Sequence, residues 1–308
     1  MSIAFLFPGQ GAQSPGFLHR LPDHPAVAAT LQEAGIVLGR EILELDTETA
    51  LRSTVAVQIG LLVAGVATAR ALAAEGVVPA MAAGLSIGSF AAAVTAGAIG
   101  FADALRLVDR RGRLMEQACP AGYGMAAVTG LPQRRVEAII AEAGRAAPLY
   151  LANLNGPTEF ALSGADAALD HAIAAARQAG ARRAERLAVA VPSHSPLMDG
   201  AAAALVSDAG AVPMAAPRIL YAGNRRARML RDAAAVREEL TTNLAHPVRW
   251  ADDVTLMAEL GATLFLEMPP GDVLTRLAAA ACPDLASRDM ERLSLTSARA
   301  LAARDRMR

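Results

Sequence analysis

A serine between two glycines is the first feature of the sequence that could do chemistry. Gly84-Leu85-Ser86-Ile87-Gly88 has the form G-x-S-x-G. Where this pattern joins a strand to a helix, the glycines allow a sharp turn that exposes the serine hydroxyl, and the next amide points toward a developing oxyanion. We therefore predict that Ser86 is a nucleophile and the Ile87 N–H an oxyanion donor. An ordinary glycine-rich turn is the alternative.

A serine nucleophile needs a base, and His194 is the histidine best placed to supply one. It follows the apolar run that ends at Pro192 and precedes a predicted helix. That is the carboxyl end of a strand, where open α/β sheets bind ligands; the alternative is a histidine in an ordinary turn. Asp199 and a backbone carbonyl are equally workable as the group that orients the imidazole. The other histidines are expected at the surface or in structural turns: His19, His24, His171 and His246.

Two further side chains are candidates for binding. Gln10 follows the Pro8-Gly9 end of the first apolar run, so its amide can point into a cleft. The alternative is an ordinary strand-to-helix turn, which would have the same sequence pattern. Arg111 lies beside Gly112 in an amphipathic segment. Arginines in such helices are usually solvated, but one that turned inward would present the bidentate fork that a carboxylate substrate requires.

The composition excludes several classes of protein. The chain has 308 residues, 54% of them hydrophobic, and its 29 basic residues balance 30 acidic ones. Such a chain buries about three quarters of its unfolded surface, which excludes an intrinsically disordered protein. The balanced charge leaves no overall field that would hold nucleic acid or an anionic membrane.

Cysteine usage and hydropathy indicate a cytoplasmic protein. Cys119 and Cys282 are far apart, so we expect neither a metal site nor a disulfide framework, and a reducing cytoplasm fits best. The N-terminal segment lacks a basic region and predicts a first strand rather than a signal peptide. Two uncharged stretches, 53–69 and 76–102, are alanine-rich or interrupted by glycine and proline. We predict that both are buried core segments and not membrane spans.

The elements around these residues predict an α/β protein in two parts. Strands of the first part are expected at 3–7, 80–83, 218–221 and 263–267, and helices at 55–74, 89–96, 103–116, 197–209, 232–244, 251–260 and 288–308. Between them, the order strand 125–129, helix 132–143, strands 149–153 and 159–163, helix 166–178 and strand 183–191 is βαββαβ. This order is typical of the ferredoxin-like unit. We therefore predict a large α/β catalytic domain, 1–123 and 192–308, with a small ferredoxin-like domain, 124–191, inserted in it.

Seven blocks of sequence, in order along nearly the whole chain, resemble the malonyl-CoA:acyl carrier protein transacylase family. The blocks are FPGQGAQ (7–13), GLSIGSF (84–90), RRGRLMEQACPAGYGMAAV (110–128), NLNGPTEFALSG (153–164), VPSHSPLM (191–198), HPVRW (246–250) and EMPPGDVL (267–274). The resemblance implies an α/β-hydrolase-like large domain with an inserted ferredoxin-like small domain. It also implies a Ser/His dyad that transfers acyl groups in a ping-pong reaction.

The resemblance also assigns roles. It implies that Ser86 accepts the malonyl group and that His194 is its base. The Gln10 side chain and the Ile87 backbone N–H match the oxyanion donors, and Arg111 matches the partner of the malonyl carboxylate. Asn243 lies where the family uses a backbone carbonyl to hold the histidine Nδ1. No cofactor and no metal are implied: the substrate is malonyl-CoA and the acceptor is the prosthetic-group thiol of an acyl carrier protein.

Two departures from the family pattern point to one of its branches. Leu85 replaces the usual histidine before the nucleophile, and Met268-Pro269-Pro270-Gly271 replaces the usual Gly-Pro-Gly. GLSIG and EMPPG look most like the malonyl transferase (epsilon) subunit of malonate decarboxylase. We therefore predict that the chain charges the carrier subunit of that complex, whose other subunits would be further partners. Malonyl transfer in fatty-acid or polyketide synthesis is the alternative.

The serine turn has two alternative interpretations. A serine esterase or thioesterase would be expected to carry a clear acid between the serine and the histidine in chain order and would not need an inward arginine. A non-catalytic carrier-docking subunit would have no use for the intact serine, histidine and glutamine.

The densest basic cluster outside the Arg111 helix predicts a docking surface for an acidic carrier, with a solvated loop as the alternative. It consists of Arg225, Arg226, Arg228 and Arg231.

Overall fold

The computed structural model describes residues 2–118 and 121–306, which form two β-sheets with helices around them. The larger sheet has the strand order β10-β9-β1-β2-β7-β8, and all its strands are parallel except the edge strand β8. Its strands are β1 (Ser2–Phe7), β2 (Met81–Gly84), β7 (Leu220–Gly223), β8 (Arg228–Leu230), β9 (Ala262–Glu267) and β10 (Ala286–Asp289). Parallel strands that are buried on both faces are continuous apolar runs, as β1 is.

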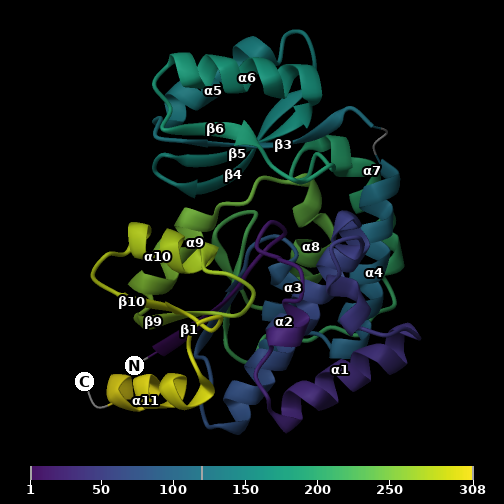
Figure 1. The fold of residues 1–308 in the computed structure, drawn as a ribbon, viewed down its shortest axis with the longest axis vertical. Helices are drawn as coiled ribbons and strands as arrows, with labels where there is room; N and C mark the ends of the chain where they lie inside the picture. The colour runs from purple at the N-terminus through teal and green to yellow at the C-terminus, as the bar shows by residue number, and fades with distance from the viewer. Residues whose placement is uncertain (1, 119–120, 307–308) are drawn as a thin grey trace.

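Helices cover both faces of this sheet (Figure 1). They are α1 (Pro25–Leu38), α2 (Thr54–Ala74), α3 (Gly88–Thr95), α4 (Phe101–Ala118), α7 (Asp199–Asp208), α8 (Ala233–Thr242), α9 (Trp250–Glu259), α10 (Val273–Ala281) and α11 (Leu295–Arg306). Short 3₁₀ helices lie at Leu18–Arg20, Leu43–Asp46, Ala50–Arg52, Pro196–Met198 and Asn243–Ala245. Phe5 and Phe7 of β1 pack with α2, α3 and α4, whereas Ala4 and Leu6 pack with α9 and α10. Alternate side chains of a strand point to opposite faces, so the sheet is the middle of three layers.

Helix α2 explains the first of the two uncharged stretches. It is long and apolar enough to cross a membrane by length and composition, but 94% of its most apolar window is buried inside the protein. It lies between α1, α3 and α4, against the sheet. An apolar helix with protein on every side is a core helix, as its alanine-rich composition predicts.

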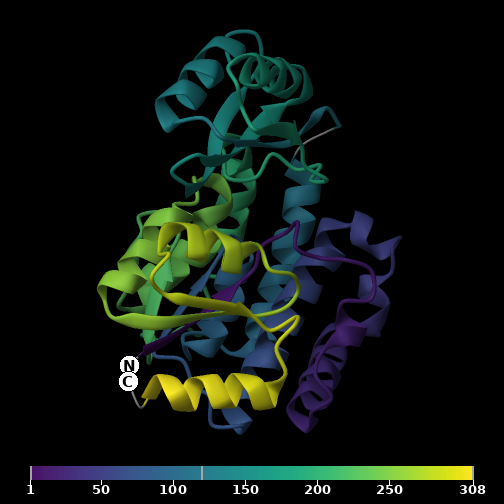
Figure 2. The ribbon, with the colours of Figure 1, turned by 60° about the vertical axis from the view of Figure 1, so that its left-hand side comes forward.

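The smaller sheet is formed by one continuous stretch of chain. Its elements are β3 (Tyr123–Thr129), α5 (Gln133–Ala143), β4 (Leu149–Gly156), β5 (Glu159–Ala165), α6 (Asp166–Gln178) and β6 (Arg183–Arg186). The strands are all antiparallel in the order β4-β5-β3-β6, and α5 and α6 cover one face and share a separate hydrophobic core with it. Figures 1 and 2 show this part stacked on one end of the larger one. The predicted α/β fold with a ferredoxin-like insertion is therefore confirmed, while the exact boundaries at 124 and 191 stay predictions.

One backbone seam joins the small sheet to the large part. Val248 lies between the 3₁₀ turn 243–245 and α9, and it forms a parallel bridge with Asn153 of β4. Its N–H donates to the Ala152 carbonyl and its carbonyl accepts from the Leu154 N–H, both at 2.8 Å. The seam therefore ties β4 to the segment that follows His246.

Several elements differ from their predicted bounds. The strand predicted at 183–191 ends at Arg186, because β3 pairs with it only as far as Ala126 and the chain then leaves the sheet. The strand predicted at 218–221 lies at Leu220–Gly223. Strands β8 and β10 were not expected: each is an edge strand with one pairing partner, and with three and four residues it is too short to show an apolar pattern. Of the helix predicted at 288–308, Leu295–Arg306 is helical. Cys119 lies outside the described residues.

Candidate active site

Ser86 stands on a strained turn between β2 and α3. Its φ is +56°, a left-handed conformation that residues with a side chain rarely adopt. The two flanking glycines make the turn possible, because a Cβ on Gly84 would lie 2.0 Å from the backbone of Gly88 and a Cβ on Gly88 would lie 2.1 Å from the Phe7 carbonyl oxygen. The predicted sharp turn between a strand and a helix is therefore present, with the Ser86 hydroxyl at its apex.

His194 lies against the Ser86 hydroxyl. The distance from His194 Nε2 to Ser86 Oγ is 2.8 Å. The other ring nitrogen, Nδ1, faces two backbone carbonyl oxygens, that of Asn243 at 2.8 Å and that of His246 at 3.1 Å. Carbonyls only accept, so Nδ1 carries the proton and Nε2 is free to accept from Ser86. Burial, with a smaller contribution from the Arg111 charge, lowers the pKa of His194 to about 4, so the imidazole is neutral at pH 7.

The backbone of His194, like its ring, is held by hydrogen bonding to a backbone carbonyl. The residue has φ +62°, and its N–H donates to the Leu244 carbonyl at 2.7 Å. Of the two orienting groups left open by the sequence, the structure therefore has the backbone carbonyl of Asn243 and not Asp199, which is at the start of α7 and makes no hydrogen bond to His194. His246 is half-buried, with its ring bonded to the Thr242 carbonyl and to Arg225.

Arg111 of α4 turns inward and ends beside the nucleophile. Its side chain is 1% exposed, and its Nη2 lies 3.3 Å from Ser86 Oγ. Its other partners are neutral amides: Nη1 donates to Gln58 Oε1 at 2.7 Å and Nη2 to Asn243 Oδ1 at 3.4 Å. No carboxylate of the described residues pairs with it, and its Nε has no partner. Burial lowers the pKa of Arg111 to about 9, which leaves it cationic at pH 7.

The oxyanion donors predicted from the sequence lie at the same end of the sheet. Ile87 follows Ser86 at the start of α3, and its N–H donates to no group of the described residues. Gln10 lies in the loop after β1, half-buried, and its side-chain amide likewise has no partner among them. Phe7 pairs with Gly84 in the parallel register of β1 and β2, so the loop after Phe7 and the turn of Ser86 leave the sheet side by side.

Two residues contact these groups without having been expected to. Gln58 lies on α2, where the sequence shows only one amide in an apolar helix; that isolated polar residue was the available signal. Asn224 follows β7, and its Oδ1 accepts from the Ser86 N–H at 2.9 Å. It lies next to the basic cluster in the sequence, and nothing local distinguishes it from a residue of a turn.

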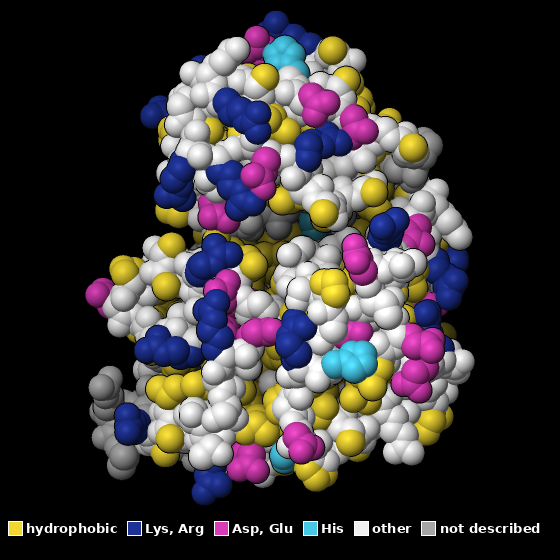
Figure 3. Space-filling model, in the orientation of Figure 1, with side chains coloured by type: hydrophobic (Ala, Val, Ile, Leu, Met, Phe, Trp, Pro, Cys, Tyr) yellow, Lys and Arg dark blue, Asp and Glu magenta, His cyan; other side chains and the backbone are white. Residues whose placement is uncertain are grey.

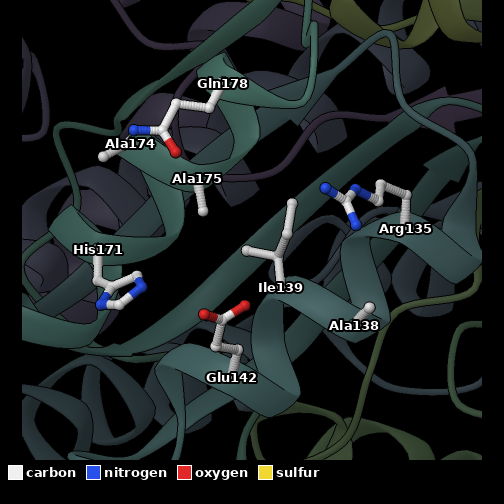
Figure 4. A pocket seen from close by; sticks show the side chains of 8 residues that line it. All are labelled: Arg135, Ala138, Ile139, Glu142, His171, Ala174, Ala175 and Gln178. Atoms are coloured by element: carbon white, nitrogen blue, oxygen red, sulfur yellow. The ribbon is translucent and has the colours of Figure 1, made fainter.

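A cavity between the two helices of the small sheet lies apart from the residues around Ser86. A cavity of about 440 Å³ lies between α5 and α6, and Figure 4 shows Arg135, Glu142 and His171 directed toward it. Its lining comes from these two helices alone, so it contains none of the residues around Ser86. No group of three or more His, Cys, Asp or Glu in the described part of the chain is arranged to hold a metal ion.

Known proteins resemble this chain along most of its length. The acyl transferase domain family matches residues 4–296. The malonyl CoA-acyl carrier protein transacylase of Salmonella typhimurium is 38% identical over 281 residues, which are 89% of this chain and 91% of that protein. The protein of the same name from Bacillus subtilis is 35% identical over 284 residues, 89% of each chain.

Solved structures agree with this relationship. The malonyl CoA-acyl carrier protein transacylase of Coxiella burnetii has a TM-score of 0.94 at 32% identity, covering 99% of this chain and 98% of that one. A malonyl-transacylase solved in complex with a type II polyketide synthase acyl carrier protein has a TM-score of 0.93 at 34% identity, covering 98% and 100%. The chain is therefore an acyltransferase that belongs to the acyl transferase domain family and, within it, to the malonyl-CoA:acyl carrier protein transacylases.

Proposed function

We propose that the protein transfers a malonyl group from malonyl-CoA to the thiol of an acyl carrier protein through a malonyl-serine intermediate on Ser86. The observation that carries this proposal is the buried Arg111, which has no carboxylate partner among the described residues and lies 3.3 Å from Ser86 Oγ. A buried cation without a counter-ion is costly unless a ligand supplies the charge. An acyl group on Ser86 that carries a free carboxylate would do so.

In the first half-reaction Ser86 attacks the thioester. His194 Nε2 takes the hydroxyl proton while Oγ forms a bond to the carbonyl carbon, and the oxyanion receives hydrogen bonds from the Ile87 N–H and the Gln10 amide. The tetrahedral intermediate then collapses, the C–S bond breaks, and the proton on His194 passes to the CoA sulfur. His194 becomes a transient cation in this step, and the two carbonyls on Nδ1 stabilise it.

The second half-reaction runs the same chemistry in reverse. The carrier thiol gives its proton to His194 and its sulfur attacks the malonyl ester. The bond between the malonyl carbon and Ser86 Oγ then breaks, and the proton on His194 returns to Oγ. The protein ends unchanged, and the two half-reactions as proposed use no metal, no cofactor and no oxidant. That no cofactor is required stays a prediction.

The identity of the carrier protein that accepts the malonyl group is a separate part of the proposal. Curated relatives and solved structures carry the name of malonyl-CoA:acyl carrier protein transacylases, and one of them was solved with the carrier of a polyketide synthase. They favour an acyl carrier protein of fatty-acid or polyketide synthesis over the malonate decarboxylase carrier. Leu85 and the Met268–Gly271 turn keep the malonate decarboxylase carrier as the second candidate, because both positions depart from the family pattern.

The predicted basic docking cluster divides into two parts. The Arg225 side chain is only 13% exposed and is held by Glu238 at 2.7 Å and by the His246 ring, so it is a structural residue. Arg226, Arg228 and Arg231 are exposed. We propose that these three face the acidic carrier. Figure 3 shows one face of the molecule hollowed between the parts built on the small and large sheets, with basic side chains on both sides of the hollow.

A hydrolase on the same turn is the rival function. It would place water where the carrier thiol enters, and Arg111 would then lack a purpose. The orienting group on His194 is a pair of backbone carbonyls and not the acid expected of a serine esterase. A cytoplasmic location, with no nucleic acid or membrane as partner, stays a prediction.

The test follows the malonyl group through both half-reactions. The protein is incubated with malonyl-CoA, and intact mass spectrometry is expected to show one added malonyl group. Adding a carrier with its phosphopantetheine arm should remove the adduct and malonylate the carrier. A competition experiment decides between the two acceptors. It offers the malonyl-enzyme equal amounts of a fatty-acid carrier and of a malonate decarboxylase carrier with its own prosthetic group, and measures which one is malonylated. Free malonate released without any carrier would identify a hydrolase instead.

A further inference from the structure

The backbone on both sides of Ser86 is held by side-chain amides. The Ser86 N–H donates to Asn224 Oδ1 at 2.9 Å, and the Ser86 carbonyl accepts from Asn243 Nδ2 at 3.3 Å. A left-handed conformation at a residue with a side chain is strained and persists only where the surroundings impose it. Asn224 therefore supplies the hydrogen bond on the N-terminal side of the strained residue.

Asn224 is itself fixed on every side. Its Nδ2 donates to Asp253 Oδ2 at 3.0 Å, and its backbone N–H donates to Glu239 Oε1 at 2.9 Å. Its carbonyl accepts from the Arg249 N–H at 3.0 Å. Asn224, Glu239 and Asp253 are at most 4% exposed, and no catalytic step described above uses them.

The neighbours decide which way the Asn224 amide faces. The Ser86 N–H can only donate, so it requires the amide oxygen, and an oxygen of Asp253 accepts from the amide nitrogen. Burial, with the nearby Glu239 charge, raises the pKa of Asp253 well above its ordinary value, and a protonated carboxyl still has an oxygen that accepts. A turned amide would place its NH₂ against the Ser86 N–H and lose both hydrogen bonds.

We propose that Asn224 is a positioning residue for the nucleophile, and that Asp253 orients its amide so that Ser86 Oγ stays within reach of His194. By occupying the Ser86 N–H, Asn224 also leaves the neighbouring Ile87 N–H as the backbone donor for the oxyanion. Ser89 shares the same acceptor more weakly, because its Oγ lies 3.4 Å from Asn224 Oδ1 and donates to the Gly84 carbonyl at 2.9 Å. The proposal rests on the proposed function only in taking Ser86 as the nucleophile.

The experiment compares one variant of Asn224, two variants of Asp253 and a control variant of Ser89. Asn224→Leu removes the acceptor, and Asp253→Leu removes the group behind it, whereas Asp253→Asn keeps an oxygen that accepts from Nδ2. Displacing a reacting atom by about 1 Å can cost roughly 10² in rate. We expect Asn224→Leu and Asp253→Leu to lower the rate of malonyl-enzyme formation by about 10–100-fold at unchanged KM for malonyl-CoA. Asp253→Asn and the control Ser89→Ala should stay within about threefold of the wild type, because a weak or replaced contact moves Ser86 little.

A second readout separates this proposal from the proposed function. A fluorophosphonate reacts with an activated serine and carries no carboxylate for Arg111, so its rate of labelling at Ser86 should fall by the same factor in both leucine variants. Melting temperatures and circular dichroism are measured on every variant. Wild-type labelling in folded Asn224→Leu, or equal losses in Asp253→Asn and Asp253→Leu, would overturn the proposal. If the wild type reacts with the fluorophosphonate but not with malonyl-CoA, the proposed function fails while the role of Asn224 is still tested by labelling.

Discussion

The reacting pair and the groups around it differ in how completely the protein itself satisfies them. Ser86 and His194 are fully engaged: the hydroxyl meets Nε2, and Nδ1 meets two carbonyls. Gln10, the Ile87 N–H and the Arg111 Nε have hydrogen-bonding capacity that nothing among the described residues uses. In the proposed mechanism the first group is positioned before the substrate arrives, and the second group obtains its hydrogen-bond partners from the substrate.

This difference separates two physical tasks. A nucleophile and its base must be aligned in advance, because their alignment is what turns an encounter into a reaction. Donors aimed at a charge that develops in the transition state gain most when they are not already satisfied by the protein. Variants of the first group should therefore lose the reaction itself, whereas variants of the second group should change its rate or its preference between substrates.

The largest effect is expected at the reacting pair. Ser86→Ala should abolish the malonyl adduct, because it removes the attacking oxygen, while the turn and its two glycines stay in place. Intact mass spectrometry after incubation with malonyl-CoA measures the adduct, and the melting temperature controls for folding. An adduct that persists in the folded variant would remove Ser86 from the mechanism.

The second effect distinguishes substrates. Arg111→Ala should lower kcat/KM for malonyl-CoA by about 10³, as expected when one partner of a buried charged pair is removed, and leave acetyl-CoA unchanged or improved. Arg113→Ala is the matched control, since Arg113 lies on the same helix but is exposed and pairs with Asp109. An unchanged ratio of the two substrates in Arg111→Ala would refute the role in binding the carboxylate.

The third effect, the loss of rate in Gln10→Ala, should not depend on the acyl group. Gln10→Ala removes one oxyanion donor, which costs on the order of 10² in rate, and the oxyanion is the same for malonyl and acetyl thioesters. We therefore expect equal losses in kcat for the two substrates with little change in KM. A loss confined to malonyl-CoA would place Gln10 with Arg111 in recognising the carboxylate.

The fourth effect appears in the dependence on pH. Burial lowers the pKa of His194 to about 4, so acylation should not vary with pH between about 5 and 8 and should fall below that range as the base takes up a proton. In the unfolded chain the histidine takes up its proton near pH 6.5, so its contribution of roughly 3 kcal/mol to the free energy of unfolding is present above that pH. It is lost as the pH falls toward 4.

Arg111 adds an upper limb to the same profile. Because burial lowers the pKa of Arg111 to about 9, malonyl transfer should decline above that pH while acetyl transfer does not. Single-turnover rates with each thioester measure both limbs, and urea unfolding between pH 4 and 8 measures stability. A malonyl profile without the upper limb would show that the charge of Arg111 does not bind the substrate.

The smallest effect is expected outside the site. Reversing the charges of Arg226 and Arg228 to glutamate should raise KM for the carrier by about three- to tenfold and weaken its salt dependence, while malonylation by malonyl-CoA stays the same. The matched control reverses Arg134 and Arg135, which are exposed on α5 at the outer side of the small sheet. Equal losses in both half-reactions would instead assign Arg226 and Arg228 to the CoA phosphates.

The sequence alone predicted the parts of this protein that depend on local pattern. The G-x-S-x-G turn, the buried first strand and the βαββαβ order each follow from the spacing of small, apolar and helix-forming residues within a short window. Short edge strands such as β8 and β10 carry no such pattern, because one pairing partner and a half-exposed position demand little of the side chains. They were therefore missed.

The tertiary structure decided which residues surround Ser86 and Arg111. His194, Arg111, Gln58 and Asn224 come from four separate segments, and no spacing within any one of them shows that they meet. The choice of a backbone carbonyl over Asp199 to orient His194 is of the same kind, since every residue has a carbonyl and only the path of the chain brings one to Nδ1. Local sequence determines what a segment can become; the packing of distant segments determines which of its groups are left for the substrate, because hydrogen bonds and burial depend on neighbours in space.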